Sequence, residues 1–347
     1  MHDTINFATI GRGMIVKHFL AAMAGIEQFH YIAAYSRSLD TARDFARRNG
    51  ADKWYTDLTA LAEDPEVDAV YIASPNACHC EQAILMMNHG IHILCEKPVA
   101  SNSLEFARMI VAARKNRVVL MEGIRTAFTP GFAGMRDLLP KLGTIRQASF
   151  RYCQYSSRYD KFKVGIVENA FKPEFSNGAL MDIGIYCVHP AAALFGRPDR
   201  IRADAVRLKS SIDGAGTILA YYADGPKAAD FDAAGGAGLL AECVYSKITD
   251  SSLPSTIRGE DAEMIIDKIY DIHHITIRYR DGRTEEYAFE PESSAFPDMK
   301  YECAEWLRRI EENVPTDPEL LADSICTLQI MDEARVQTGI VYPADET

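Results

Sequence analysis

The sequence predicts two domains: a parallel, doubly wound α/β domain over residues 1–124, followed by an α+β domain over residues 125–347 with a large, mostly antiparallel open sheet. In the first domain, short apolar runs alternate with helical patterns of about 10–15 residues, which is typical of βαβ units. Beyond residue 125, strand-like runs follow one another with few helices between them. The length of 347 residues also favours two domains, at roughly 150 residues each.

Each strand of the first domain is expected at a short, continuous apolar run, because a strand inside a parallel sheet is buried on both faces. These runs lie at residues 5–10, 31–35, 68–73, 91–95 and 118–121. Apolar residues at helical spacing predict helices at 14–24, at 39–49, before Gly90 and at 102–116. Gly50 is suited to end one helix, and Asn102 with Glu105 forms a capping box that begins the last one.

Seven strand-like runs predict the sheet of the second domain, at 146–154, 201–209, 217–222, 240–248, 262–268, 275–279 and 285–289. Asp281-Gly282 signals a tight hairpin turn between the last two. Helices are expected at 178–195, 299–312 and 318–337, and the Ala-, Gly- and Asp-rich segment 224–238 is expected to be a surface loop. Because the open face of such a sheet must be covered or paired, we expect a homodimer or homotetramer formed through it.

Composition and charge narrow the class of partner. Hydrophobic residues make up 48% of the chain and charged residues 25%, as in ordinary folded proteins. The 49 acidic and 37 basic residues give a formal net charge of −12. So acidic a protein is a poor general binder of nucleic acid or of an anionic membrane, because both need clustered Lys and Arg. A small anionic ligand stays compatible with this charge, since a few local cations suffice to bind it.

The N-terminus and the cysteines predict a cytoplasmic protein with no signal peptide and no membrane span. The first residues carry no basic segment followed by a long apolar one, and no apolar run reaches 18 residues. The eight cysteines are scattered without a C-x-x-C pair, which is typical of reduced thiols. Cys78-His79-Cys80 is the only close group, and a zinc site usually needs a second cluster, so we predict no metal site.

A glycine-rich turn after the first strand predicts a dinucleotide site. The segment 10–16 reads IGRGMIV, in which Gly11 permits a tight turn and Gly13 lets the backbone approach a pyrophosphate. The N-terminus of the following helix supplies unpaired N–H groups and a positive dipole end. The third position of the motif is Val16 rather than Gly or Ala, and a plain strand-to-helix turn is the alternative interpretation. The residues expected to contact the cofactor here are Gly11, Arg12, Gly13, Met14 and Ile15.

The end of the second strand favours NADP(H) over NAD(H). NAD sites usually carry an acidic residue there for the ribose 2′-hydroxyl, whereas this chain has Ser36-Arg37 and no acid until Asp40. A hydroxyl and a guanidinium suit a 2′-phosphate, because Arg presents a charged fork to its oxygens. Arg12 and Arg43 are candidate helpers, with a solvated surface position as the alternative for each.

Two longer motifs then carry a resemblance to a known family. Residues 74–100 read SPNACHCEQAILMMNHGIHILCEKPVA, and residues 176–190 read SNGALMDIGIYCVHP. With the glycine turn, they resemble the Gfo/Idh/MocA oxidoreductases, and D-I-G-I-Y is most similar to the glucose–fructose oxidoreductase and dimeric dihydrodiol dehydrogenase branch. The resemblance implies a Rossmann domain, a C-terminal sheet that mediates oligomerisation, and an NAD(P)-dependent dehydrogenase or reductase. Such an enzyme transfers a hydride between the nicotinamide and a hydroxyl or carbonyl carbon of a sugar, polyol or cyclic vicinal diol.

The resemblance also implies site residues. The lysine of E-K-P is Lys97, the helix aspartate is Asp182, and the acid/base position four residues later is Tyr186. Further cofactor contacts are implied at Ser74, Pro75, Asn76, His79, Glu96 and Lys97. For His79, a structural histidine at a helix end is the alternative.

The chain departs from the family pattern in two places. Where that branch usually has Arg-Phe before a proline, this chain has Ala127-Phe128 and then Thr129, so Arg125 is the candidate substitute. The glycines before the helix are reduced to Asn177-Gly178. Both departures concern the substrate contacts more than the chemistry.

Reduction of a carbonyl group needs a hydride from the nicotinamide and a proton for the alkoxide that develops. Asp182 and Tyr186 are four residues apart, so they share one face of a helix, and His189 lies near that face. A phenol alone is a poor base at neutral pH, and a nearby ammonium favours its phenolate form. Either Tyr186 exchanges the proton while Lys97 holds the substrate oxygen, or the two roles are reversed. Asp182 would orient Lys97 or bind a substrate hydroxyl.

Two smaller interpretations concern individual residues near these motifs. His189 is a candidate substrate contact, with a core histidine as the alternative. Lys97-Pro98 is a candidate cis peptide, because X–Pro bonds tolerate the cis form.

Two other functions remain open at this point. A relative that holds its cofactor tightly and cleaves glycosidic bonds by transient oxidation would carry the same motifs. A non-catalytic dinucleotide-binding regulator is the second alternative, although both Lys97 and Tyr186 are present.

The substrate contacts are expected in the loops 158–175 and 224–238.

Overall fold

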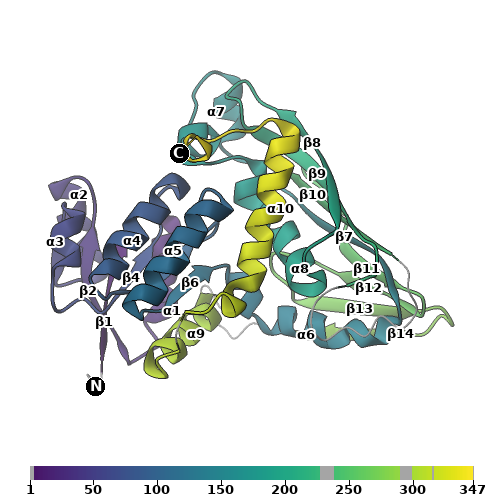
Figure 1. The fold of residues 1–347 in the computed structure, drawn as a ribbon, viewed down its shortest axis with the longest axis horizontal. Helices are drawn as coiled ribbons and strands as arrows, with labels where there is room; N and C mark the ends of the chain where they lie inside the picture. The colour runs from purple at the N-terminus through teal and green to yellow at the C-terminus, as the bar shows by residue number, and fades with distance from the viewer. Residues whose placement is uncertain (1–3, 227–237, 290–298, 315, 347) are drawn as a thin grey trace. The chain divides into compact units, whose positions relative to one another are not determined.

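The computed structural model describes residues 4–226, 238–289, 299–314 and 316–346 (Figure 1). It divides into two compact units. The first unit comprises Met1–Arg125 with Pro291–Leu321, and the second comprises Thr126–Glu290 with Ala322–Thr347. Most of the predicted surface loop 224–238 lies outside the described residues.

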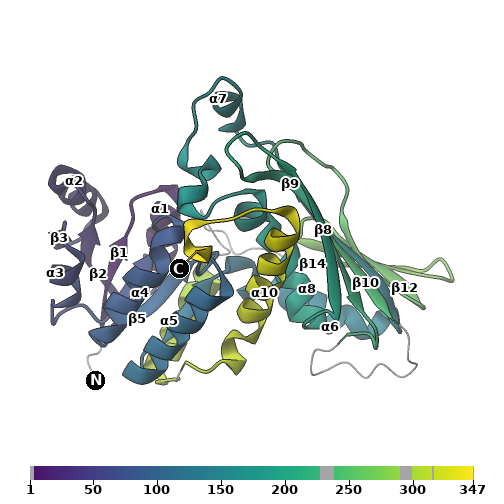
Figure 2. The ribbon, with the colours of Figure 1, turned by 45° about the horizontal axis from the view of Figure 1, so that its top comes forward.

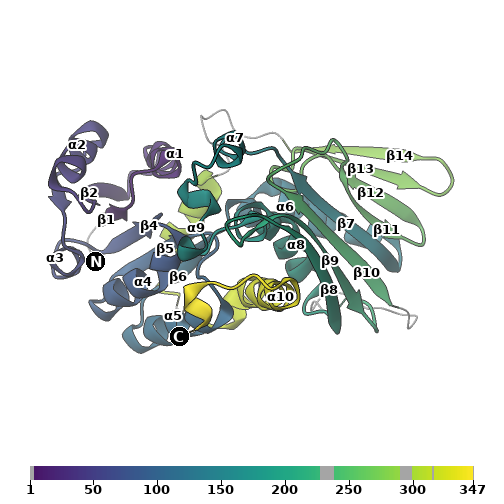
Figure 3. The same cartoon turned by 90° about the horizontal axis from the view of Figure 1, so that it is seen from above.

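The first unit is built on a six-stranded parallel sheet in the order β3-β2-β1-β4-β5-β6. Its helices lie on both faces, with α1 and α2 on one side and α4 and α5 on the other (Figure 3). The predicted doubly wound parallel fold is therefore confirmed. The strands are β1 (Ile5–Ile10), β2 (Phe29–Tyr35), β3 (Lys53–Tyr55), β4 (Ala69–Ile72), β5 (His92–Glu96) and β6 (Leu120–Gly123); the helices are α1 (Met14–Met23), α2 (Leu39–Asn49), α3 (Leu58–Ala62), α4 (His79–Asn88) and α5 (Ser103–Asn116).

The sheet register brings the carboxyl ends of the central strands to one edge. Ile10 at the end of β1 pairs with Tyr35 of β2 and with Ile72 of β4. Glu96 at the end of β5 pairs with Gly123 of β6. The segments that follow these strands, including the glycine turn and the E-K-P motif, therefore begin at the same edge of the sheet, which is where open α/β sheets bind ligands.

The predictions for the first unit fail for elements that are very short and for one helix that lies far along the chain from the rest of the unit. The edge strand β3 and the helix α3 were not predicted, because three and five residues are too short to show a period. The helix α9 (Met299–Glu311) was assigned to the second domain but belongs to the first unit. Its Trp306 is fully buried, and the ring stacks on Phe29 with centroids 5.4 Å apart. A single second domain from residue 125 to the end is thus wrong for this helix.

The second unit is built on an eight-stranded sheet in the order β14-β13-β12-β11-β7-β10-β9-β8. All neighbours are antiparallel except the parallel pair β7 and β10, so the predicted mostly antiparallel sheet is confirmed. Only β11 was not predicted. The strands are β7 (Ile145–Cys153), β8 (Arg200–Arg207), β9 (Asp213–Tyr222), β10 (Leu239–Ser246), β11 (Ser255–Gly259), β12 (Ala262–Ile266), β13 (His274–Tyr279) and β14 (Thr284–Ala288).

Helices cover one face of this second sheet. Figure 2 shows α6 (Pro130–Leu138), α8 (Ile185–Phe195) and α10 (Ala322–Thr338) on the same side of it. The helical stretch Pro173–Phe195 is long and apolar enough to cross a membrane, but 94% of its apolar window is buried inside the protein. That degree of burial is typical of the core helix of a folded domain.

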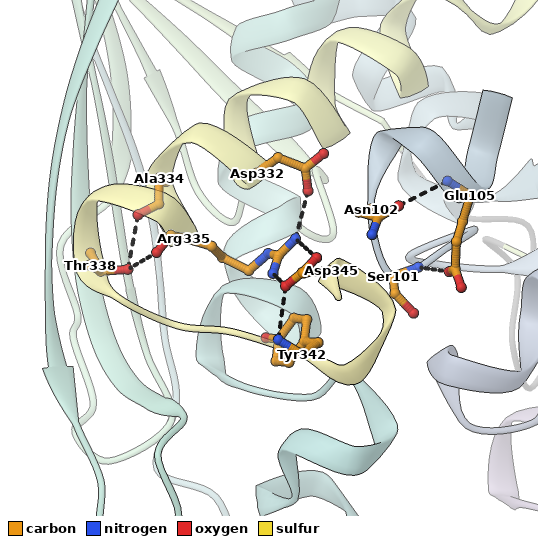
Figure 4. Close-up of polar contacts among 9 residues, drawn as sticks. All are labelled: Ser101, Asn102, Glu105, Asp332, Ala334, Arg335, Thr338, Tyr342 and Asp345. Carbon is orange, nitrogen blue, oxygen red and sulfur yellow. Dashed lines mark hydrogen bonds and ion pairs between the residues drawn. The ribbon is translucent and has the colours of Figure 1, made fainter. Parts of the chain in front are cut away.

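Polar contacts fix helix ends in both units (Figure 4). In the first unit, Asn102 accepts a hydrogen bond from the Glu105 main-chain N–H at 2.8 Å, as the capping box predicts. The Glu105 carboxylate accepts in turn from the Ser101 N–H at 2.9 Å. In the second unit, Arg335 of α10 donates to Asp345 at 3.0 Å and thereby ties the C-terminal turn to the helix.

Candidate active site

The turn between β1 and α1 has a glycine where the backbone requires one. Gly11 has a φ of 123°, and a Cβ there would lie 2.5 Å from the carbonyl oxygen of Ala73. At Gly13, by contrast, a Cβ would have no described atom within 4 Å, and the φ of −67° suits any residue. Among the described residues, no side chain caps the N-terminus of α1. The turn therefore leaves open space and unpaired N–H groups where a pyrophosphate would bind.

The third position of the glycine motif is explained by packing. Val16 is completely buried on α1, beside Phe19, whose ring stacks on Tyr71 of β4 with centroids 3.7 Å apart. A valine at this position fills the helix–sheet interface that a small residue would otherwise leave open. Met14 is exposed and Ile15 half-buried in the first turn of α1.

The edge beyond β2 is cationic. Arg37 is exposed and lies close enough to Tyr35 and Cys78 for its charge to act on both. Burial raises the pKa of each of these two groups, and the guanidinium opposes that rise. Ser36 bonds through its hydroxyl to Thr41 at 2.8 Å. Arg43, the other candidate helper, forms an ion pair with Asp40 at 2.9 Å, whereas Arg12 is exposed.

The E-K-P segment is held by its neighbours in the first unit. The Lys97-Pro98 peptide is cis, as expected, and Lys97 is half-buried. Glu122 on β6 accepts a hydrogen bond from the Val99 N–H at 2.9 Å. His79 is buried, with Nδ1 3.0 Å from the carbonyl oxygen of Pro98 and Nε2 2.9 Å from that of Ser74. Its ring therefore bridges two loops, which favours the structural alternative over a cofactor contact.

A group of buried acids lies behind this segment. The Tyr71 hydroxyl donates to Glu96 at 2.5 Å, and burial raises the pKa of Glu96. Glu302 of α9 is also buried; neither of its oxygens has a hydrogen-bond partner in the described part of the chain, and burial raises its pKa well above the ordinary value. The charge of Arg125 acts on both carboxyls and opposes these rises. Arg125, a candidate substrate contact, thus has buried acids as neighbours.

The D-I-G-I-Y helix of the second unit begins on a buried carboxylate. Asp213 accepts from the Leu180 N–H at 2.6 Å, and burial raises its pKa to about 6. A Cβ on Gly178 would lie 2.0 Å from Oδ1 of Asp213, so the remaining glycine of the motif makes room for this contact. Residues Leu180–Gly184 form a π-helical turn that leads into α8, a feature often found at functional sites.

Asp182 and Tyr186 both lie on this helix, with different surroundings. Asp182 lies in the π-helical turn, and its Oδ2 is 2.7 Å from Nζ of Lys247. Tyr186 is 6% exposed and packs edge-on against Tyr152, with ring centroids 5.8 Å apart.

His189 lies in the packed interior of the second unit. It is 3% exposed, and its ring is 5.8 Å from that of Phe132. Burial and then the charge of Arg136 lower its pKa to about 4, so it is neutral at physiological pH. These surroundings favour the core histidine over the substrate contact.

Family comparisons agree with this geometry. The model described as "Oxidoreductase family, NAD-binding Rossmann fold" matches residues 5–124, and the Gfo/Idh/MocA C-terminal domain model matches residues 135–234. The NADP(+)-dependent scyllo-inositol 2-dehydrogenase IolU of Bacillus subtilis is 47% identical over 99% of both chains. The chain belongs to the Gfo/Idh/MocA family of oxidoreductases.

More distant relatives extend the comparison. A trans-1,2-dihydrobenzene-1,2-diol dehydrogenase of Xenopus tropicalis is 27% identical over 95% of this chain and 97% of its own. The crystal structure of KijD10, a 3-ketoreductase from Actinomadura kijaniata in complex with NADP and TDP-benzene, superimposes with a TM-score of 0.80 at 20% identity, covering 96% of this chain and 98% of its own. At that identity the likeness supports the Gfo/Idh/MocA fold alone.

Sequence reasoning missed the residues that support the family motifs. The side chains of four such residues are buried and ionisable, and each lies more than 20 positions from the motif that it supports: Glu122, Asp213, Lys247 and Glu302. One signal was available for Glu122, which interrupts the apolar run of β6. The others follow or begin strands and helices in ways that no local pattern distinguishes.

We predict that substitutions at the two glycines of the turn separate folding from dinucleotide binding. Gly11→Ala places a Cβ against the Ala73 carbonyl at a positive φ, so it should lower the free energy of unfolding by about 2 kcal/mol or more. Gly13→Ala should fold normally and weaken dinucleotide binding at least about tenfold, because its methyl enters the open space. Chemical denaturation and fluorescence titration measure the two effects. Equal behaviour of the two variants would contradict this assignment.

We also predict a pH dependence of stability from His189. Its pKa is about 4 in the folded chain against 6.5 in the unfolded one, so the unfolded chain takes up more protons as the pH falls below about 6.5. This residue should therefore remove about 2 kcal/mol of stability between pH 7 and pH 5. Urea denaturation at the two pH values should show a smaller loss in His189→Gln than in the wild type. An identical loss of stability in both proteins would contradict the prediction.

Proposed function

We propose that the protein is an NADP(H)-dependent oxidoreductase that interconverts a hydroxyl and a carbonyl carbon of a polyol, sugar or cyclic vicinal diol. The observation that carries the cofactor choice is the edge beyond β2, where Arg37 follows a strand end without an acid. The open space at Gly13 and the uncapped start of α1 suit the pyrophosphate. The similarity to an NADP(+)-dependent inositol dehydrogenase over nearly the whole chain supports the same choice of cofactor and substrate class.

The bound cofactor would supply or accept the hydride. We propose that Lys97 holds the substrate oxygen by its charge and that Tyr186 exchanges the proton with it. The half-buried position of Lys97 and the packing of Tyr186 on Tyr152 restrict how far either side chain can move. Asp182 is proposed to accept hydrogen bonds from substrate hydroxyls, because its carboxylate is fixed by Lys247 and remains 37% exposed.

The cofactor contacts proposed in the first unit fall into two groups. Main-chain N–H groups of the turn bind the phosphates, and side chains at the sheet edge bind the ribose and nicotinamide. Glu96 and His79 are buried beneath this edge and are proposed to support it rather than to touch the ligand. The contacts are Gly11, Arg12, Gly13, Met14 and Ile15 from the turn, Ser36 and Arg37 from the β2 edge, and Ser74, Pro75, Asn76 and Lys97 from the loops after β4 and β5.

We further propose a homodimer or homotetramer that pairs through the second sheet. In the described part of the chain, helices lie on one face of that sheet only (Figure 2). Leu219 and Leu240 are about two-fifths exposed on β9 and β10, which are neighbouring strands. A second copy of the sheet would cover them. The eight free cysteines are consistent with a reducing compartment such as the cytoplasm.

We expect Arg37→Ala to weaken NADPH binding about tenfold or more and to change NADH binding less than twofold. The reason is that only NADPH carries the 2′-phosphate to which the guanidinium would bind. Arg48→Ala, at an exposed site in the last turn of α2, is the matched control and should change neither affinity. Fluorescence titration with both cofactors measures this. Tight NADH binding by the wild type would overturn the NADP(H) assignment.

We expect Tyr186→Phe to lower kcat for polyol oxidation by about a hundredfold while NADPH still binds, because the proton-exchanging hydroxyl is lost. Turnover is measured on a panel of inositols, sugars and diols by monitoring the absorbance of the reduced cofactor. A loss of less than about tenfold would favour Lys97 as the proton carrier. If the wild type oxidises no substrate of the panel yet cleaves glycosides while retaining its cofactor, the result supports the glycosidase alternative. If it binds NADPH but catalyses neither reaction, the result supports a non-catalytic dinucleotide-binding regulator.

A further inference from the structure

A buried lysine outside all of the sequence motifs contacts the helix that carries Asp182. Lys247 directly follows β10, and its side chain is 4% exposed. Its Nζ lies 2.7 Å from Oδ2 of Asp182 and 3.3 Å from the carbonyl oxygen of Ala170, and it is 4.9 Å from the ring centre of Phe171. A buried ammonium is costly unless it is paired, so this set of contacts indicates a specific role.

The main chain around Lys247 is held on both sides. Its N–H donates to the carbonyl of Gly214 at 2.8 Å, and its own carbonyl accepts from the Ser156 N–H at 2.9 Å. The side chain therefore starts from a fixed point in the sheet. Its charge also acts on Asp213, the carboxylate that caps the same helix. The Lys247 ammonium thus interacts with two carboxylates at the start of the helix, those of Asp182 and Asp213. Asp182 is the more exposed of the two.

We infer that Lys247 is a positioning residue that holds the Asp182 carboxylate in one orientation and in its ionised form, so that the exposed side of this carboxylate accepts hydrogen bonds from adjacent hydroxyls of the substrate. The inference rests on the proposed function of Asp182. A fixed carboxylate with several acceptor lone pairs suits a neutral compound with neighbouring hydroxyl groups. Lys247 itself is too buried to be a substrate contact.

The decisive variant is Lys247→Met, which keeps the length of the side chain and removes its charge. Its KM for the polyol should rise about tenfold or more, because the carboxylate is no longer oriented or favoured in its charged form. The acidic limb of its kcat/KM profile should move to higher pH for the same reason. NADPH affinity should stay within about twofold of the wild type, since the cofactor contacts proposed above lie elsewhere.

Three further variants separate this role from a merely structural one. Asp182→Asn should raise KM similarly, and the double variant should lose little beyond either single one, because both changes remove the same interaction. Lys141→Met, which breaks an exposed ion pair with Glu285, is the matched control and should leave KM and the pH profile unchanged. Additive losses in the double variant would overturn the inference, as would an unchanged KM and pH profile in Lys247→Met.

The assay also distinguishes this inference from the proposed function. Absence of turnover in the wild type would refute the function itself, whereas normal turnover with an insensitive Lys247→Met refutes only the positioning role. If Lys247→Met does not fold, Lys247→Arg provides the test, because it keeps the charge but displaces it. Its kcat/KM for the polyol should fall severalfold with NADPH affinity unchanged. A wild-type kcat/KM in Lys247→Arg would count against the inference.

Discussion

A buried carboxylate that accepts a main-chain hydrogen bond fixes each segment that carries the candidate catalytic residues. Glu122 accepts from Val99 just after Lys97, and Asp213 accepts from Leu180 just before Asp182. A buried acceptor of this kind is expensive to leave unpaired, so the main chain that satisfies it has little freedom. The side chains used for chemistry therefore extend from segments whose backbone is set by the core of each unit.

The local arrangement of charge explains why an acidic protein can offer a site for an anionic cofactor. The net charge of −12 describes the whole chain, whereas the start of α1 has no acid in its first turn and no side-chain cap in the described structure. Arg37 adds a cation at the neighbouring strand end. In the second unit, the charge of Lys247 is balanced by the carboxylate of Asp182. Local arrangement rather than total charge decides what each region can bind.

Much of the fold was predictable because apolar runs and their spacing reflect burial directly. Most of the predicted strands lie within about two residues of their predicted positions, since a buried strand shows as a continuous or alternating apolar run; β9 begins four residues earlier than predicted, and β11 was not predicted. The failures have physical causes. The strand β3 is too short to show a period, and α9 joins the first unit because Trp306 fills a space beside Phe29 that only the folded chain creates.

The sequence by itself determined the architecture of two sheets, the family and the motif residues, because short-range patterns of glycine, apolar and charged residues carry that information. Only the tertiary structure decided which distant side chains support those motifs. His79 bridges two loops, the charge of Glu96 acts on Glu302, and Lys247, directly after β10, contacts Asp182 in the helical turn before α8. Lys247 and Asp182 are 65 positions apart in the chain, and Glu302 and Glu96 are 206 apart. No local pattern specifies such pairs, because they form only when packing closes the chain around buried polar groups.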